Sequence, residues 1–520
     1  MSNSEKIMSQ VKTLRYKWDT IPWSKLERKV SKLQNRIYRA SKEGDIARVR
    51  KLERLLLTST NAKLLAVRKV TQINKGKRTA GVDGKANLSK KQRIKTAMEI
   101  TMKATTKPLR RVWIPKQGKE TFRPLGIPTI MDRAKQTLVK MALEPEWEAK
   151  FDPNQYGFRP KRSCHDAIEG IFCAINMKNA YVLDADISGC FDNIDHEVLL
   201  RKLNISPKVR KLVKVWLKAG VIDNNVFAVT ESGTPQGGTI SPMLANVALC
   251  GLESDIKKAL IEDLFQFLKL KRKKMLEEQI VPSKWNATRE QAAKGLSIII
   301  YADDFVVIHE SLEIILKAKE YIATWLKNIG LELNKGKTRI CHTYLRYGDN
   351  NVPGFDFLGF NIRQYEDKHK ELGYTTLIKP NKESIKRHLY KIAKTIDKHR
   401  WGNQYILIKA LNPIIRGWCE YYRYSVASKI FSSTEYEVMN KIFRWIHRKH
   451  SNKNGKWKKN KYFQVDARSK WRFRIPDKIG LVRHSAYQIM RYIKVRGNKS
   501  PFDGDCVYWK NREKRSYVAA

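Results

Sequence analysis

No stretch of the 520-residue sequence approaches the roughly 18–20 uncharged apolar residues that a membrane-spanning helix requires. The N-terminal segment MSNSEKIMSQVKTLRYKW has no apolar core, so we expect no secretory signal there. Glycine and proline form no low-complexity tract, and 42% of the residues are apolar, which excludes wholesale disorder. At about 150 residues per domain, the length predicts three or four folded domains.

Cysteine is scarce and poorly placed for cross-linking or metal binding. The seven cysteines are an odd number, lie far apart and form no CxxC pair. This spacing excludes a disulfide framework and a four-cysteine zinc site. We expect reduced thiols, as in a cytosolic protein.

Acidic residues are also few, since 51 Asp and Glu face 103 Lys and Arg and give a formal net charge of +52. An excess of this size indicates a polyanionic partner, and nucleic acid is the usual one. Residues 441–520 carry 23 Lys and Arg against five Asp and Glu, with tryptophan and tyrosine interleaved. Such a segment suits contacts to a phosphate backbone combined with stacking on bases.

Two pairs of acids nevertheless stand at the ends of apolar segments. Asp184 and Asp186 close a short apolar strand, and Asp303 and Asp304 lie at the tip of an expected hairpin over 297–310. Carboxylates beside buried segments are costly unless cations neutralise them. Mg²⁺ prefers oxygen ligands, and a pair of Mg²⁺ ions can activate a hydroxyl and stabilise a leaving pyrophosphate. The acids therefore predict nucleotidyl transfer, although an Asp-Asp pair alone is also typical of a solvated turn.

The remaining pattern divides the chain into helical and strand-rich parts. Helical spacing of apolar residues extends over 1 to about 75 and resumes from about 375. Residues 110–128 alternate around a turn at Gly118, which predicts a β-hairpin. Residues 255–294 are rich in charge and lose the strand pattern, so we expect an inserted helical hairpin or loop.

Four segments occur in an order and spacing that chance does not explain. They are RPLGIPTIMDRAKQ (123–136), QYGFRPKRSCHDAI (155–168), TPQGGTISPMLANV (234–247) and YADD (301–304). Together they resemble reverse transcriptases, and specifically the reverse transcriptase/maturase proteins encoded by group II introns, over roughly residues 20–510. The resemblance implies an α+β right-hand polymerase, with fingers and palm on an antiparallel sheet, followed by an all-α thumb or maturase domain and a basic DNA-binding tail.

The implied domains are a basic helical extension (1–75), fingers and palm (76–365) with the insertion at 255–294, a thumb or maturase domain (366–450) and a basic DNA-binding region (451–520). Many relatives continue into an HNH nuclease with paired cysteines and histidines, and this sequence has none. We therefore expect no endonuclease activity, with priming from another source such as a strand at a replication fork.

The resemblance also implies roles for the acids. Asp186, Asp303 and Asp304 are the implied catalytic residues and ligands of two Mg²⁺ ions, with the backbone carbonyl of Ile187 as a further ligand. Asp184 shares the strand face of Asp186, two residues away, but fits a structural or phosphate-side role better.

Three of the residues implied to bind the incoming dNTP precede the glycine-rich loop at 236–238. Lys116 and Arg123 lie on opposite arms of the finger hairpin and resemble a cationic pair that holds the triphosphate. Phe191 resembles the aromatic gate that excludes a 2′-OH, and its alternative is a residue of the core.

The other implied dNTP contacts follow in the chain. Gln236, with Gly237 and Gly238, resembles a loop that packs against the nascent base pair, where glycine lets the backbone approach closely. Lys337 resembles the lysine that protonates the leaving pyrophosphate, a role for which Lys335 competes.

Two later segments resemble parts that hold the primer and the intron RNA. FLGF (357–360) resembles the primer grip, and its alternative is a plain hairpin of the core. NPIIRGWCEYYRYS (412–425) resembles the maturase helix. The residues implied to be divided between its core and RNA contacts are Arg416, Trp418, Tyr421, Tyr422 and Arg423.

The resemblance implies an RNA-directed DNA polymerase that binds group II intron RNA, assists its splicing and supports intron mobility by target-primed reverse transcription. The implied partners are the intron RNA, target DNA, a primer and dNTPs, with no membrane, in a ribonucleoprotein of the bacterial cytoplasm or of an organelle; the oligomeric state stays open. The alternatives are a retron-type or other bacterial reverse transcriptase, and a splicing-only maturase. The intact acids disfavour the splicing-only protein, and the long extension, insertion and basic tail disfavour the retron type.

Overall fold

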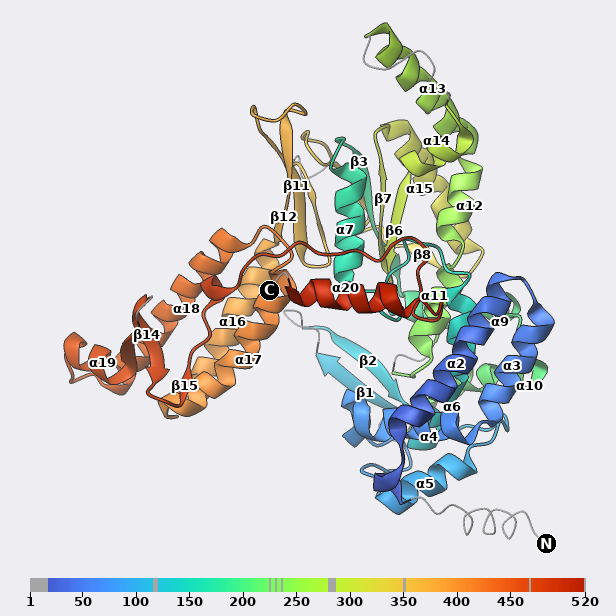
Figure 1. Ribbon diagram of the computed structural model, residues 1–520, viewed down its shortest axis with the longest axis horizontal. Helices are drawn as coiled ribbons and strands as arrows, with labels where there is room; N and C mark the ends of the chain where they lie inside the picture. The colour runs from blue at the N-terminus through green and yellow to red at the C-terminus, as the bar shows by residue number, and fades with distance from the viewer. Residues whose placement is uncertain are drawn as a thin grey trace. The chain divides into compact units, whose positions relative to one another are not determined.

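A computed structural model describes residues 17–115, 120–223, 226–229, 232–234, 237–278, 287–348, 352–466 and 469–518 (Figure 1). The chain forms two compact units. The first comprises the described residues of 1–167, 183–339 and 495–509, and the second those of 168–182, 340–494 and 510–520. Among the described residues, no helix has both the length and the apolar character needed to cross a bilayer.

A cluster of helices opens the first unit. Its members are α2 (Trp23–Lys42), α3 (Ile46–Thr58), α4 (Thr60–Arg68), α5 (Lys90–Glu99) and α6 (Ile130–Glu148). Helix α2 buries Leu26, Val30 and Ile37 on one face, at the spacing of an amphipathic helix. Asp45 and Ser59 cap α3 and α4 by accepting hydrogen bonds from backbone N–H groups of the first turn. The helices expected in the extension are therefore present over its described residues.

A four-stranded sheet follows these helices, with the order β2-β1-β4-β5. Its strands are β1 (Leu109–Pro115), β2 (Phe122–Ile127), β4 (Val221–Asp223) and β5 (Val226–Ala228). Strands β1 and β2 pair antiparallel, which confirms the hairpin expected over 110–128. Strand β1 also pairs with β4, in parallel.

The second sheet of this unit has the order β6-β7-β3-β8, with β9 also paired to β3. Its strands are β3 (Tyr181–Ser188), β6 (Ser297–Tyr301), β7 (Asp304–His309), β8 (Glu332–Leu333) and β9 (Arg339–His342). Strands β6 and β7 form an antiparallel hairpin, as expected, and lie beside β3 (Figure 1). The middle residues of β6 and β7 are fully buried, which matches their continuous apolar sequence.

Several helices connect these strands. They are α7 (Cys164–Ile175), α8 (Cys190–Asn193), α9 (His196–Leu203), α10 (Pro207–Leu217), α11 (Ser241–Leu249) and α15 (Leu312–Lys327). The inserted segment forms α12 (Leu252–Ala259), α13 (Ile261–Glu277) and α14 (Arg289–Gly295), and α13 packs on α14. The insertion is therefore a helical hairpin, one of its two expected forms.

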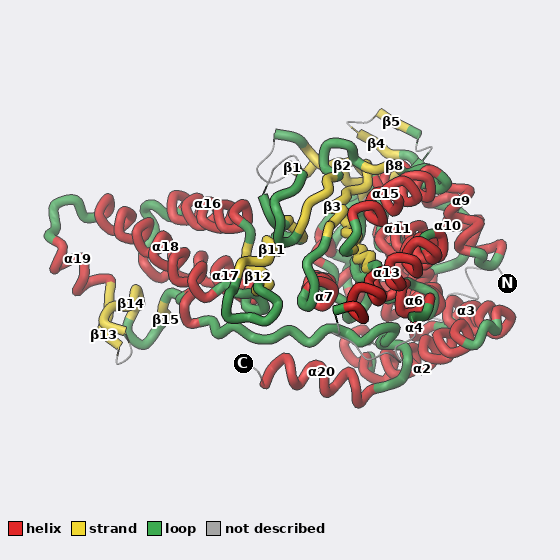
Figure 2. Tube along the Cα trace, turned by 90° about the horizontal axis from the view of Figure 1, so that it is seen from above, coloured by secondary structure: helices red, strands yellow, loops and turns green. Residues whose placement is uncertain are grey.

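The second unit combines a small sheet with three long helices. Its elements are β10 (Phe355–Phe357), β11 (Phe360–Glu366), β12 (Tyr374–Pro380), α16 (Lys382–Lys398), α17 (Gln404–Tyr422), α18 (Ser428–Lys449), α19 (Gly455–Tyr462), β13 (Phe463–Asp466), β14 (Ser469–Ile475) and β15 (Ile479–Gly480). Helix α16 packs against α17 and α18 (Figure 2). Ile392, Leu411 and Ile442, one from each helix, are fully buried.

Part of the last described segment belongs to the first unit rather than to the basic region that precedes it. Residues 495–509 belong to the first unit, and helix α20 (Cys506–Val518) begins there. The side chain of Ser500 is fully buried. The expected tail over 451–520 therefore does not form a single compact body.

Candidate active site

The acids of the two apolar segments meet at the ends of their strands. Tyr301 pairs with Asp304 across the β6–β7 hairpin, which leaves Ala302 and Asp303 as a two-residue turn. Ala302 has a φ of 60°, which a two-residue hairpin turn requires. The N–H of Ile187 donates to the carbonyl of Asp303 at 3.1 Å, and this hydrogen bond ties the turn to the end of β3.

The negative charges of these acids lie close enough to affect one another. Burial, together with the charges of Asp303 and Asp186 and a hydrogen bond that protonated Asp304 donates to Asp186, raises the pKa of Asp304 to about 7. Burial also raises the pKa of the Cys190 thiol to about 12, with Asp303 and Asp186 adding to the effect. Asp186, Asp303 and Asp304 therefore form one electrostatically coupled group.

A lysine from the loop after β8 neutralises part of this charge. The Nζ of Lys337 lies 2.7 Å from Oδ2 of Asp186, and this hydrogen bond raises the pKa of Lys337. Asn334 contacts the same acid twice, because its N–H donates to the carbonyl of Asp186 at 2.8 Å and its Nδ2 to Oδ2 at 3.3 Å. Lys335 and Lys337 are both exposed, but Lys337 is the one whose ammonium group pairs with Asp186.

The donor set of these acids suits a divalent cation. Asp186, Asp303 and Asp304 supply carboxylate oxygens, and the pKa of Asp304 is raised chiefly by burial and further by the two neighbouring carboxylates, which Lys337 only partly offsets. Among the described residues, no three His, Cys, Asp or Glu side chains already stand in the arrangement of a metal site. Ile187 is buried, and in the sheet it lies opposite Leu333 of β8.

Asp184 stands apart from this group in its contacts. It shares β3 with Asp186, but its Oδ2 accepts a hydrogen bond from Nε of Arg339 at 3.0 Å. This ion pair favours the structural role expected for Asp184 and makes it a matched control for Asp186.

The loop carrying the QYGF sequence supports the turn of the acids. Tyr156 and Ile300 form a backbone hydrogen bond of 2.8 Å, so the loop lies along β6. A β-carbon at Gly157 would clash with the backbone nitrogen of Ala302, which explains why glycine stands there. Asn246 holds the loop from the other side, because its Nδ2 donates to the carbonyl of Gly157 at 2.7 Å.

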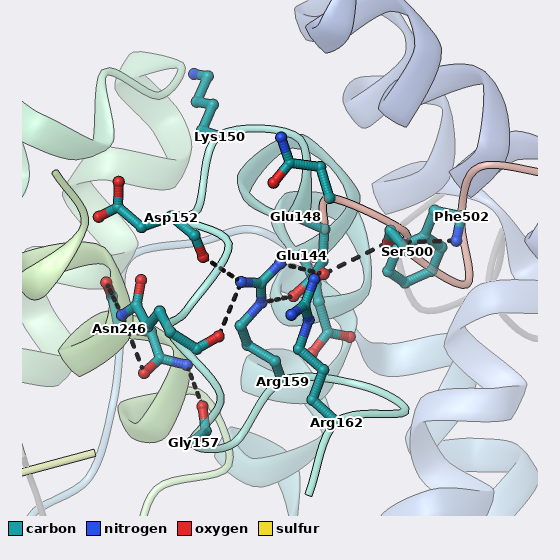
Figure 3. Close-up of polar contacts among 12 residues, drawn as sticks. Glu144, Glu148, Lys150, Asp152, Gly157, Arg159, Arg162, Asn246, Ser500 and Phe502 are labelled. Carbon is teal, nitrogen blue, oxygen red and sulfur yellow. Dashed lines mark hydrogen bonds and ion pairs between the residues drawn. The ribbon is translucent and has the colours of Figure 1, made fainter. Parts of the chain in front are cut away.

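A buried ion pair fixes the base of the same loop. The guanidinium of Arg159 makes two hydrogen bonds to the carboxylate of Glu148, at 2.9 and 3.0 Å (Figure 3). Its NH1 donates to the carbonyls of Asp152 and Gln155. The hydroxyl of Ser500 donates to Glu148 at 3.4 Å, which brings the C-terminal segment into the cluster.

Besides Lys337, two of the residues expected to bind the dNTP lie among the described residues. Phe191 is half-buried and meets Phe158 edge to face, with ring centroids 6.1 Å apart. Arg123 is exposed on β2, opposite Ile114 of β1. Gly237 has a φ of 122°, and a β-carbon there would lie 2.6 Å from the carbonyl oxygen of Gly126 on β2.

Two other expected dNTP residues lie outside the described residues. They are Lys116, which follows Pro115 in the sequence, and Gln236, which precedes Gly237. Their placement at the nucleotide therefore stays a prediction.

In the second unit, the FLGF segment forms a tight turn held by the C-terminal end of helix α17. Phe357 pairs with Phe360, and Leu358 and Gly359 have positive φ values of 48° and 83°. The hydroxyl of Tyr421 donates to the carbonyl of Leu358 at 2.9 Å, and that of Tyr422 to Gly359 at 3.1 Å. The segment is a hairpin turn, and its role as a primer grip stays a prediction.

The remaining residues of the maturase-like helix differ in burial. Trp418 stacks on His388 with centroids 4.4 Å apart, and Tyr422 is buried. Arg423 pairs with Glu420 at 3.1 Å. Arg416 is exposed, so it is the side chain of this set most open to a partner.

Three protein-family models match successive regions of the chain. The family described as reverse transcriptase (RNA-dependent DNA polymerase) matches residues 114–362, the N-terminal domain of reverse transcriptase matches 18–100, and the group II intron maturase-specific domain matches 385–463. Protein YkfC of Escherichia coli strain K12 is 31% identical over 351 residues, which are 64% of this chain and 88% of that protein. The chain belongs to the group II intron reverse transcriptase/maturase family.

Other members of the family share much of this chain. The group II intron-encoded protein LtrA of Lactococcus lactis subsp. cremoris is 30% identical over 407 residues, 67% of this chain and 66% of LtrA. The chain thus spans just under two thirds of that relative. Maturase-like protein 1 of Euglena gracilis is 26% identical over 422 residues, 78% of this chain and 77% of that protein.

Some residues that hold the site of this reverse transcriptase/maturase together had no role predicted from the sequence. Asn334 begins the NKGK segment that contains Lys337, and Asn246 is the second-last residue of the Gly-rich segment 234–247, so both lie in segments that already drew attention. Their signal was a polar side chain next to an apolar stretch. Arg159 and Glu148 gave no such signal, because each is one charge among many.

Proposed function

We propose that this chain is an RNA-directed DNA polymerase that acts together with group II intron RNA. The observation that carries the proposal is the meeting of Asp186, Asp303 and Asp304 at the ends of β3 and the β6–β7 turn, with Lys337 on Asp186. The reverse transcriptase family match over 114–362 includes all four residues. A decayed scaffold would have no reason to keep three coupled carboxylates, which are costly beside apolar strands.

The chain's own residues would divide the work of nucleotide addition. Two Mg²⁺ ions on Asp186, Asp303, Asp304 and the carbonyl of Ile187 would supply charge neutralisation and activation of the primer hydroxyl. Lys337 keeps a proton beside the acids and would deliver it to the leaving pyrophosphate.

The nucleotide itself would be oriented by residues around the acids. Arg123, together with Lys116, would hold the triphosphate by charge. Phe191, positioned edge-on by Phe158, would lie under the sugar and reject a 2′-OH. Gln236 and the backbone at Gly237 and Gly238 would pack against the nascent base pair.

RNA binding and DNA binding would fall to the second unit and the basic tail. The maturase-specific match over 385–463 supports contacts to intron RNA, with Arg416 the most exposed of the expected residues. The helices α16 to α18 would act as thumb and maturase domain, and 451–520 would contact DNA. The protein would work in a cytoplasmic or organellar ribonucleoprotein, assist splicing, and extend a primer at the target DNA.

The test is extension of a DNA primer on an RNA template with dNTPs and Mg²⁺. We expect extension by the wild type and a loss of at least about a hundredfold in Asp186→Asn, the order seen when a main electrostatic group of an active site is removed. The matched control is Asp184→Asn, on the same strand, which should keep most of the activity because Asp184 pairs with Arg339.

Two results would contradict the proposal. Equal loss in Asp184→Asn and Asp186→Asn would show that the assay reports folding rather than the acids. No extension by the wild type, with tight binding of intron RNA, would leave a splicing-only maturase.

A further inference from the structure

A cavity of about 480 Å³ opens in the second unit between the C-terminal half of α18, helix α19 and the start of β13. Its volume lies in the range of about 300–1,000 Å³ that is typical of small-molecule sites. The residues that line it are Phe443, Arg444, Ile446, His447, Arg448, Gly455, Lys458, Lys459 and Phe463. The cavity lies away from α17, whose residues were the expected RNA contacts.

The rim of the cavity is basic. Among the described residues that line it there is no Asp or Glu, whereas there are two arginines and two lysines. Arg444 and Lys459 are exposed and neither forms an ion pair with a described residue, although the ammonium group of Lys459 lies 3.6 Å from the ring centroid of Trp471. Arg448 reaches Asp397 at 3.7 Å, but both side chains are more than half exposed, so this pair is weak. The cavity therefore attracts a negatively charged group.

The floor of the cavity is aromatic. The rings of Phe443 and Phe463 stack with centroids 5.1 Å apart and an interplanar angle of 20°. Phe463 is buried, but Phe443 is 51% exposed, which is unusual for a phenylalanine held by a neighbouring ring. The exposed part of Phe443 offers a flat apolar surface beside the basic rim.

A hydrogen-bonding group completes the wall. Nζ of Lys458 lies 3.1 Å from Nδ1 of His447, which places an ammonium donor against that ring nitrogen. His447 is exposed, so its other ring nitrogen, Nε2, can meet a polar group of a ligand. An aromatic surface, a donor and several cations around one small cavity match the base, base edge and phosphate of a nucleotide.

We propose that this cavity binds one unstacked nucleotide from a loop or bulge of RNA. Its base would lie on Phe443, and its phosphate beside Arg444 and Lys459. A base inside a duplex is stacked on both faces and is not available to such a cavity, whereas unpaired RNA bases can turn outward and stack on aromatic side chains. The inference rests on the proposed binding of intron RNA and names a contact through which the maturase region would recognise RNA shape.

The test compares two RNA probes with the full-length protein. One is a fluorescein-labelled RNA hairpin with a single bulged uridine in its stem, and the other is the same hairpin without the bulge. We expect tighter binding of the bulged probe, and Phe443→Ala to weaken it roughly tenfold while leaving the unbulged probe unchanged, because one base–aromatic stack is lost. A bulged 4-thiouridine should crosslink to the peptide that contains Phe443.

The matched control is Tyr436→Ala, which removes an aromatic side chain that is 68% exposed on the same helix but outside the cavity. This variant should bind both probes like the wild type. Arg444→Gln combined with Lys459→Gln should reduce the salt dependence of binding to the bulged probe, because fewer counterions are released.

Equal affinity of the wild type for the two probes would overturn the inference, as would equal effects of Phe443→Ala and Tyr436→Ala. If Phe443→Ala weakened the binding of a DNA duplex but left the binding of the bulged RNA unaffected, the cavity would be assigned to DNA. That result would also overturn the inference. Primer extension on an unstructured RNA template is measured for the same proteins. Extension that fails in the wild type contradicts the polymerase proposal, whereas the comparison of the two probes is read independently of it.

Discussion

The ammonium group of Lys337 lies 2.7 Å from the carboxylate of Asp186, the acid at the end of β3. Lys335, two residues earlier, is exposed like Lys337 but forms no ion pair with a described acid. Asn334 fixes the start of this loop through two hydrogen bonds to Asp186. The loop after β8 therefore delivers one particular lysine to the acids, although the sequence offers two.

This placement predicts different effects for the two lysines. Lys337→Met should lower the single-turnover rate of dNTP incorporation by about 100-fold or more, the usual contribution of a positioned proton donor. Lys335→Met, the matched control, should leave the rate nearly unchanged. Rapid-quench measurement of one incorporation, with primer–template binding measured in parallel, tests this. If both variants incorporated the nucleotide at the wild-type rate, neither lysine would act in the chemical step.

Phe191 should control the choice of sugar. Phe191→Ala removes the ring that Phe158 holds edge-on, and opens space beneath the nucleotide sugar. We expect the preference for dNTP over NTP to fall by about tenfold or more, the scale on which a lost steric contact changes selectivity. Incorporation kinetics with dATP and ATP measure it. An unchanged ratio, with dATP incorporated normally, would make Phe191 a residue of the core, its alternative interpretation.

The ion pair of Arg159 and Glu148 should dominate the stability of the first unit. Both side chains are almost fully buried. Glu148→Ala would leave Arg159 buried without its partner, which costs about 3–5 kcal/mol of the free energy of unfolding. Arg289→Gln, which breaks the exposed pair with Glu262, should change the melting temperature little. Thermal denaturation compares the two variants, and similar melting temperatures would contradict the prediction.

The paired histidines of the second unit should make its stability depend on pH. Nε2 of His388 lies 2.9 Å from Nε2 of His484, and burial lowers the pKa of His388 to about 3 and that of His484 to about 4. Between about pH 6.5 and 4 the unfolded chain binds protons that the native rings do not, so stability falls as the pH falls. Each histidine contributes up to about 1.4 kcal/mol per pH unit.

The measurement is urea denaturation at pH 7 and pH 5, followed by tryptophan fluorescence, because Trp418 stacks on His388. His388→Gln should reduce the loss of stability between the two pH values. His369→Gln is the control, since His369 is exposed. The same loss in wild type and in His388→Gln would contradict the prediction.

Features that depend on neighbouring residues could be predicted from the sequence. The β6–β7 hairpin follows from two apolar strands around a polar turn, and β1–β2 from alternation around Gly118. The burial of the maturase-like helix also had a local signal. Leu411, Ile415, Cys419 and Tyr422 lie three or four residues apart, which is the pattern of a buried helical face.

Features that depend on distant residues could not be predicted. The choice of Lys337 over Lys335 is made by the turn that Asn334 starts, and both lysines lie in the same short motif. Ser500 stands in a basic, polar stretch with no helical or strand pattern, so nothing nearby indicates that it is buried beside Glu148. The functional roles were expected from family resemblance rather than from geometry, because spacing alone does not identify a ligand.

The return of residues 495–509 to the first unit also sets an order of events during synthesis. The hydroxyl of Tyr38 in α2 donates to the carbonyl of Asn498, across 460 residues of sequence. A ribosome adds about 5–20 residues per second, so roughly 25–90 s separate the two partners. In the nascent first unit, the surface around Glu148 therefore stays uncovered until almost the whole chain has left the ribosome.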